Sequence, residues 1–351
     1  MQVRPADSHD PAPDVGARAA GDDIASMPKI ELHVHLEGTI SAAVARQLAQ
    51  RHGHDPAAEL VLENGRYPQR YQDFMHFVDT FLATSRQIRT PDDLETVAAA
   101  FAAEQARQNI VYSEVTFTAL THVANGMPER DMWRALDSGL SAEGGITIGV
   151  IVDAVRELGP EAADRTITMI EDASANIVGL GLTGVEGSVH ESAFVALRTA
   201  ANRLGLGLTV HAGETGAPAN VAAALDELDT DRIGHGVASI DDPELVVRLA
   251  REQVVLEVCP TSNVTLGLYP SLDAHPLPQL VSAGVAVTIN SDDPPFFGTT
   301  LTDELRIAAN VLGLDRAGLA QLQTRAIDAS FAPAGIKRAV RRQIETWERN
   351  V

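Results

Sequence analysis

Apolar and polar positions alternate along the chain in two distinct patterns from about residue 30 onwards. Short runs rich in Val, Ile and Leu predict β-strands, and the longer stretches between them, rich in Ala, Leu, Arg and Glu, predict amphipathic helices. The predicted strands are 30–36, 110–117, 146–153, 177–183, 207–211, 231–235, 254–258 and 285–291. The clearest predicted helices are 92–108, 160–173, 191–204, 219–228, 242–252 and 302–312.

Strands that alternate with helices indicate an α/β protein built on a parallel sheet. This rhythm fits both an open doubly wound sheet and a closed (β/α)8 barrel, and eight strands in a chain of 351 residues favour the barrel. Polar side chains that can do chemistry follow several of the predicted strands, and only a closed ring brings such distant strand ends to one mouth. We therefore predict a (β/α)8 TIM barrel with a helical insertion after the first strand.

The insertion extends over residues 53–90. Its aromatic and apolar positions predict an amphipathic helix: Tyr71, Phe74, Phe77, Val78 and Phe81. The apolar face of this helix either adds to the core or forms a lid over the barrel mouth. Residues 1–26, rich in Asp, Pro and Ala, predict a disordered N-terminal extension, so a single domain is expected over 27–351.

The charge balance narrows the choice of partners. The chain has 48 acidic and 27 basic residues, a formal net charge of −21, which disfavours nucleic acid and anionic membranes. The same excess of acid also serves simply to keep a protein in solution. Cys259 is the only cysteine, which excludes an intrachain disulfide and a cysteine-based zinc site. No run approaches the roughly 18 apolar residues of a membrane span, and no signal peptide is recognisable, so we expect a cytoplasmic protein.

Three histidines and one aspartate end predicted strands and form a candidate metal site. His33 and His35 are two residues apart in a strand, so both side chains point to the same face. His211 ends a later strand and Asp292 ends the last one. A lone buried histidine is usually structural, but two on one face of a strand favour metal binding. Three imidazoles and one carboxylate suit catalytic zinc, and iron or cobalt suits the same ligands.

Three further polar residues are candidates for proton transfer or substrate binding. Glu214 follows His211 by three residues, where it can reach a substrate without binding the metal, although it also fits a structural cap. His235 lies between Gly234 and Gly236, which leave room for a ligand, although a satisfied core histidine is the alternative. Asp293 points away from Asp292 if the strand continues, but Asp-Asp-Pro is also a common turn signal.

Five segments together resemble the adenosine deaminase family, in its order and at its spacing: 27–38 (MPKIELHVHLEG), 211–214 (HAGE), 232–236 (RIGHG), 259–263 (CPTSN) and 291–294 (SDDP). The resemblance covers about residues 27–335 and implies a barrel with one zinc ion per chain, held by His33, His35, His211 and Asp292. It also implies that Glu214 protonates ring nitrogen N1 of a 6-aminopurine. His235 would orient and deprotonate the attacking water, Asp293 would bind N7, and the backbone of Gly184 would bind N3.

Two departures from the family pattern concern the substrate. Glu37 stands where many adenosine-specific members have Asp, and it would lie at the sugar end of the pocket. Gly181 replaces a residue that is commonly acidic, and the surroundings look more like the branches acting on adenine or aminodeoxyfutalosine. The carboxylate of aminodeoxyfutalosine would need a cation from the insertion, such as Arg66, Arg70 or Arg86.

The sequence analysis therefore predicts hydrolytic deamination of a small-molecule purine nucleoside of the adenosine type. Aminodeoxyfutalosine and free adenine are the alternative substrates, and a catalytically dead binding barrel is the alternative outside enzymes. A two-metal hydrolase bridged by a modified lysine is disfavoured, because Lys29 and Lys337 are the only lysines and neither lies on a middle strand. The sequence is also compatible with a homo-oligomer.

Overall fold

Eight strands form a single parallel sheet in this computed structural model, which describes residues 23–171 and 173–350. Each strand pairs with the next along the chain, in the order β1 to β8. The strands are β1 (Lys29–His35), β2 (Ile110–Phe117), β3 (Thr147–Val155), β4 (Ile177–Thr183), β5 (Gly207–Ala212), β6 (Arg232–His235), β7 (Val255–Val258) and β8 (Ala286–Ile289). All eight predicted strands are confirmed.

The ring closes between the end of β8 and β1. Asp292, three residues after β8, donates its amide to the His33 carbonyl and accepts the His35 amide, both at 3.1 Å. The predicted TIM barrel is therefore confirmed. Because all strands are parallel, their carboxyl ends meet at one mouth of the barrel. This mouth was predicted from the polar residues that follow distant strands in the sequence.

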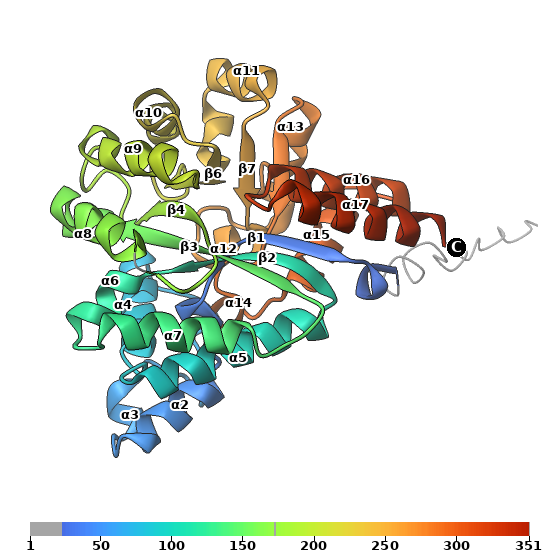
Figure 1. Ribbon diagram of the computed structural model, residues 1–351. Coiled ribbons are helices and arrows are strands. Elements are labelled where there is room, and N and C mark those ends of the chain that lie inside the picture. Colours follow the sequence, from blue (N-terminus) through green and yellow to red (C-terminus); the bar gives the residue numbers. More distant parts are fainter. Residues whose placement is uncertain (1–22, 172, 351) are drawn as a thin grey trace, which may run out of the picture.

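Helices surround the barrel and include the six that the sequence predicts (Figure 1). The longer ones are α2 (Ala42–Arg51), α4 (Phe74–Ser85), α5 (Pro91–Arg107), α7 (Glu129–Leu140), α8 (Pro160–Glu171), α9 (Val195–Leu204), α10 (Pro218–Leu228), α11 (Pro243–Glu252), α15 (Leu301–Leu312), α16 (Arg316–Ala329) and α17 (Ala334–Arg349). Short helices are α3 (Pro56–Glu59), α6 (Ala119–Ala124), α12 (Pro260–Thr265), α13 (Leu277–Ser282) and α14 (Pro294–Phe297). The 3-10 turns are η1 (Glu37–Thr39), η2 (Arg156–Leu158), η3 (Glu191–Phe194), η4 (Val237–Asp241) and η5 (Leu272–Ala274). No helix of the described part is long and apolar enough to span a membrane.

The insertion after β1 carries the predicted amphipathic helix as α4. Asp73 caps it by accepting the His76 amide at 2.9 Å, and its aromatic face packs on α14, which directly follows Asp293. Phe77 stacks on Phe297 with ring centroids 5.3 Å apart. Helix α4 thus contributes to a small second core, and it also lines the cavity described below.

The predicted extension 1–26 lies largely outside the described residues. Its last four residues are described and differ from the prediction, because 23–26 are helical. Ile24 is fully buried, Asp23 pairs with Arg316 of α16, and Ser26 accepts a hydrogen bond from Trp347 of α17 at 3.2 Å. The sequence did not predict these contacts, because a single apolar side chain in a polar segment is a weak signal for packing against the barrel.

Candidate active site

A cavity of about 390 Å³ opens at the carboxyl ends of the strands. Strand ends and the residues that follow them form its inner part, whereas α4 and η2 form its outer wall. The lining residues include His35, Phe74, Phe77, Val78, Phe81, Leu82, Thr118, Asp153, Val155, Glu157, Leu158, Thr183, Gly184, Val185, His211, Glu214, His235, Asp292 and Asp293. Most predicted site residues therefore share one pocket.

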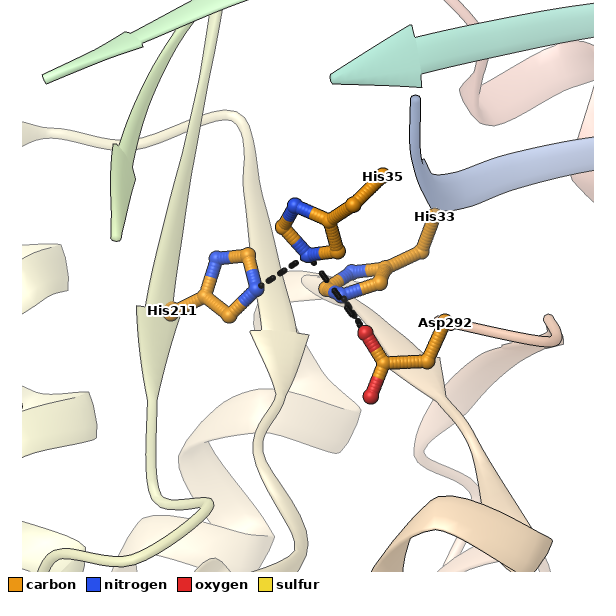
Figure 2. A group of neighbouring side chains, drawn as sticks. All are labelled: His33, His35, His211 and Asp292. Atoms are coloured by element: carbon orange, nitrogen blue, oxygen red, sulfur yellow. Dashed lines mark hydrogen bonds and ion pairs between the residues drawn. The ribbon is translucent and has the colours of Figure 1, made fainter. Parts of the chain in front are cut away.

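The four predicted metal ligands converge at the base of this cavity (Figure 2). One nitrogen or oxygen from each of His33, His35, His211 and Asp292 lies within 4.8 Å of all the others. The Nε2 atoms of His35 and His211 are 3.2 Å apart, and Asp292 Oδ1 is 3.4 Å from Nε2 of both His33 and His35. Two ligand atoms about 2.0–2.1 Å from a shared zinc at tetrahedral angles are roughly 3.3 Å apart.

The polar atoms around the cluster fit a metal as well as the distances do. His33 Nε2 is buried and has no hydrogen-bond partner among the described residues. His33 Nδ1 lies 2.8 Å from Glu257 Oε2 and donates to it, so the lone pair of Nε2 faces the cluster. A buried nitrogen without a partner is costly unless something binds it. The donor set therefore suits zinc.

Glu257 was not predicted as a site residue, and it anchors the metal cluster to the barrel interior. Besides His33, it accepts from Thr209 at 3.2 Å and from the guanidinium of Arg232. Arg232 also contacts Glu114 at 2.6 Å. Burial alone would raise the pKa of Glu257, but the charges and hydrogen bonds of Arg232 and His33 together outweigh it and lower the pKa to about 2. A signal was available, because an ionised side chain inside the apolar run VLEV requires a buried partner.

Asp292 and His235 adopt unusual backbone conformations. Their φ angles are 63° and 61°, in the left-handed region that non-glycine residues rarely adopt. Asp292 is held there by the bridge to β1, and its Oδ2 accepts from Ser262 at 2.7 Å. Such strain occurs most often where a side chain must be aimed at a ligand.

Glu214 lies beside the metal cluster in the turn after β5. Its side chain is 10% exposed, and its Oε1 is 3.6 Å from His235 Nε2. The carboxylate of Glu186 holds this turn by accepting the amides of Gly213 at 2.6 Å and Glu214 at 2.8 Å. Burial, followed by the negative charges of Asp292 and Glu186, raises the pKa of Glu214 well above its usual range. Burial therefore favours the protonated form of this acid beside the cluster.

Asp293 and Gly184, which the resemblance assigns to the substrate base, both line the cavity. Asp293 Oδ1 is buried and has no hydrogen-bond partner among the described residues, and burial and Asp292 raise the pKa of this carboxyl well above its usual range. It packs on Gly38, where a Cβ atom would come within 1.7 Å of Oδ1. Gly184 has a φ of 93°, and its Cβ would meet Glu157 at 2.1 Å. Both glycines are required by close contacts.

Glu37, like His33, is a predicted site residue that does not line the cavity. It is 1% exposed, and its Oε1 accepts from His122 Nε2 at 2.9 Å and from the Thr118 amide at 3.2 Å. Its other oxygen, Oε2, is buried and has no hydrogen-bond partner among the described residues. Sequence reasoning missed the pairing because His122 follows 85 positions later.

The model of the family described as adenosine deaminase matches residues 28–347. The chain belongs to the adenosine deaminase family. It is 39% identical over 330 residues to an aminodeoxyfutalosine deaminase of Streptomyces avermitilis, covering 92% of each chain. It is also 39% identical over 308 residues to an adenine deaminase of Chelativorans, covering 86% of this chain and 93% of the relative. Membership makes the chain a deaminase-type hydrolase, and the recognition made from the five segments is confirmed.

A solved structure supports the fold and the metal. An amidohydrolase from Burkholderia ambifaria with bound zinc aligns with a TM-score of 0.83 at 25% identity, covering 96% of this chain and 94% of that one.

Lys29 donates to three backbone carbonyls around the amino end of β1, those of Ala25, Met27 and Gln108. It is thus far from the role of a bridging lysine, in line with the prediction of a single metal.

Proposed function

We propose that this deaminase uses one zinc ion to hydrolyse a 6-aminopurine nucleoside with a large 5′ substituent, aminodeoxyfutalosine in the first place, and releases ammonia. The observation that carries the reaction is the convergence of a three-histidine, one-aspartate cluster with Glu214, whose pKa is raised by burial, and with His235 at one cavity. No single one of these residues would be specific, but together they supply each group that the hydrolysis needs.

His33, His35, His211 and Asp292 would hold the zinc. When bound, zinc supplies a Lewis acid that makes water a nucleophile near neutral pH. The proton that makes carbon C6 electrophilic comes from the chain itself, since Glu214 lies beside the cluster and burial favours its protonated form. The water oxygen adds to C6, the C6–N6 bond breaks, and ammonia leaves with the oxygen's remaining proton. Asp293 and the backbone of Gly184 would orient the base.

The charges in the cavity argue against a nucleotide substrate. The lining includes five acidic side chains, Asp153, Glu157, Glu214, Asp292 and Asp293, and no lysine or arginine. A phosphate on the 5′ carbon would find no lysine or arginine in the lining to pair with, which disfavours it. The substrate should therefore be uncharged near the sugar.

The outer wall favours a large apolar substituent over a bare base. Phe74, Val78 and Phe81 of α4 and Leu158 of η2 all line the cavity, and Leu158 is 52% exposed. Covering such surface contributes about 25 cal/mol per Å², and free adenine would leave it uncovered. The long 5′ substituent of aminodeoxyfutalosine ends in an aromatic carboxylate, which would reach solvent beyond the acidic residues. The arginines suggested by the sequence, Arg66, Arg70 and Arg86, are exposed and lie outside the lining.

A substrate panel tests the proposal. We expect kcat/KM to be highest for aminodeoxyfutalosine, lower for adenosine and 2′-deoxyadenosine, and lowest for adenine. Leu158→Ser should lower only the first of these values, since a surface substitution leaves the inner cavity and the fold intact. Adenine as the best substrate would refute the nucleoside assignment, and adenosine as the best would refute the role of the apolar wall.

A further inference from the structure

His235 ends a row of three buried polar side chains that leads away from the cavity. Its Nδ1 lies 3.2 Å from Nδ2 of Asn263 on α12. The amide oxygen Oδ1 of Asn263 lies 3.1 Å from Nε2 of His275, just after η5. Nδ1 of His275 then accepts the backbone amide of Leu277, at the start of α13, at 3.1 Å. Asn263 and His275 are 0% and 2% exposed, so water does not compete for these contacts.

The backbone amide at the end of this row fixes the direction of every hydrogen bond in it. The amide of Leu277 can only donate, so His275 Nδ1 must carry a lone pair, and the ring proton of a neutral His275 lies on Nε2. That proton is donated to Oδ1 of Asn263. The Asn263 amide group cannot be flipped, because a flip would set its NH2 group against the Nε2 proton of His275. Its NH2 group therefore points at His235 and donates to Nδ1.

We infer that Asn263 and His275 are positioning residues that fix the tautomer of His235, with the ring proton on Nε2, the nitrogen facing the cavity. A proton on Nδ1 would be set against the NH2 group of Asn263 in a buried contact, so both the other tautomer and the imidazolium are disfavoured. His235 Nε2 lies 3.6 Å from Glu214 Oε1 and 3.9 Å from Asp292 Oδ2. The cavity thus meets an N–H donor from His235.

This tautomer changes the role of His235 in the reaction, a consequence that rests on the proposed function. A nitrogen that already carries a proton has no lone pair left to deprotonate water. His235 therefore donates a hydrogen bond to the oxygen of the attacking water and orients it, in place of the base that the family resemblance implies. One water proton passes to the Glu214 carboxylate as the oxygen bonds to C6, and Glu214 has delivered its own proton to N1. The second water proton leaves with the amino group as ammonia, so atoms and charge balance.

The tautomer can be measured directly, apart from activity. Long-range 1H–15N correlation spectra of protein labelled at histidine separate protonated from unprotonated ring nitrogens, and the His235→Ala spectrum assigns the signals of His235. The zinc-loaded protein should show a protonated Nε2 and an unprotonated Nδ1 for His235. A proton on Nδ1, alone or together with one on Nε2, overturns the inference.

Substitution of Asn263 tests whether the row controls the tautomer. Asn263→Asp keeps the shape but offers only acceptors, so the His235 proton should appear on Nδ1. We expect kcat to fall between about 10- and 10⁴-fold, the upper value being the effect of a wrong histidine tautomer in a serine protease, with KM and zinc content unchanged. His275→Gln should retain most of kcat, because its amide still donates to Asn263, whereas His275→Leu should not.

A matched control is Asn176→Asp, since Asn176 donates to the Ile148 carbonyl at 3.0 Å near the opposite end of the barrel. This variant should keep both the His235 spectrum and kcat. An Asn263→Asp protein with an unchanged His235 spectrum overturns the inference, and the wild-type spectrum decides the tautomer if that variant does not fold. A protein with protonated Nε2 that deaminates none of the panel refutes the proposed function alone.

Discussion

Replacing Glu257 by glutamine tests whether this residue supports the metal site in addition to stabilising the barrel. Glu257 is 1% exposed and accepts hydrogen bonds from His33, Thr209 and Arg232. Glutamine has the same shape but carries one acceptor and one donor in place of two acceptors. Whichever way the amide turns, its NH2 group faces a donor, either the His33 ring or the Arg232 guanidinium.

The loss of these contacts should lower two quantities, the free energy of unfolding and the affinity for zinc. Removing one partner of a buried ion pair costs about 3–5 kcal/mol of unfolding free energy, and we expect the lower end, about 3 kcal/mol, because Arg232 keeps Glu114 at 2.6 Å. Losing the acceptor that orients a metal-binding histidine typically lowers metal affinity by about 10–100-fold. Glu257→Gln should show both effects.

Glu114→Gln is the matched control. Glu114 contacts the same Arg232 and also accepts from Tyr112 at 2.8 Å, but it has no hydrogen bond to a metal ligand. Urea unfolding of the zinc-free proteins should give similar losses of stability for the two variants. Competition with a chromophoric chelator should show weaker zinc binding for Glu257→Gln only. Equal zinc affinities in the two variants would refute the claim that Glu257 orients His33.

Three further predictions address the acid, the N-terminal segment and pH. Glu214→Gln should keep its zinc and lose about 10²–10⁴-fold in kcat, and a variant within a few-fold of wild type in an ammonia-release assay would exclude this acid. Deleting 1–22 should leave the melting temperature unchanged, whereas deleting 1–26 should lower it by several degrees, because Ile24 is buried and Asp23 pairs with Arg316; equal melting temperatures would contradict this. Burial raises the pKa of Glu304 from 4.5 to about 7, so its stabilising contribution is present below pH 4.5 and is lost as pH rises through 7. At 1.36 kcal/mol per pKa unit, the free energy of unfolding of the wild type should fall by about 3 kcal/mol relative to that of Glu304→Gln between pH 4.5 and 8, as measured by urea unfolding. Parallel pH profiles of the two proteins would refute the raised pKa of Glu304.

The strands and the histidine–aspartate cluster were predictable because their signals are local. A run of apolar residues defines a strand whatever it pairs with, and the two-residue spacing of His33 and His35 puts both on one face wherever the strand lies. The barrel then needs only the count of strands and the position of His211 and Asp292 at strand ends. Each of these inferences uses neighbours in the sequence.

Contacts between distant segments were not predictable in the same way. The fold brings Glu37 and His122 together from positions 85 residues apart, and the sequence around neither residue indicates the other. Glu257 and Arg232 did leave a trace, as charged residues within buried strands, although the sequence could not say that they pair with each other. The row from His235 to His275 joins the end of β6, helix α12 and the residue after η5, which are distant in the sequence. Such partners are set by the closed ring rather than by local pattern.

The most direct test of the account is a zinc titration of the metal-free protein, read by ammonia release from aminodeoxyfutalosine. The proposed site predicts that activity rises linearly to one zinc per chain and then stays constant, and that His211→Ala neither binds zinc tightly nor releases ammonia. Activity that needs two zinc ions per chain, or that persists without metal, would contradict the one-metal mechanism.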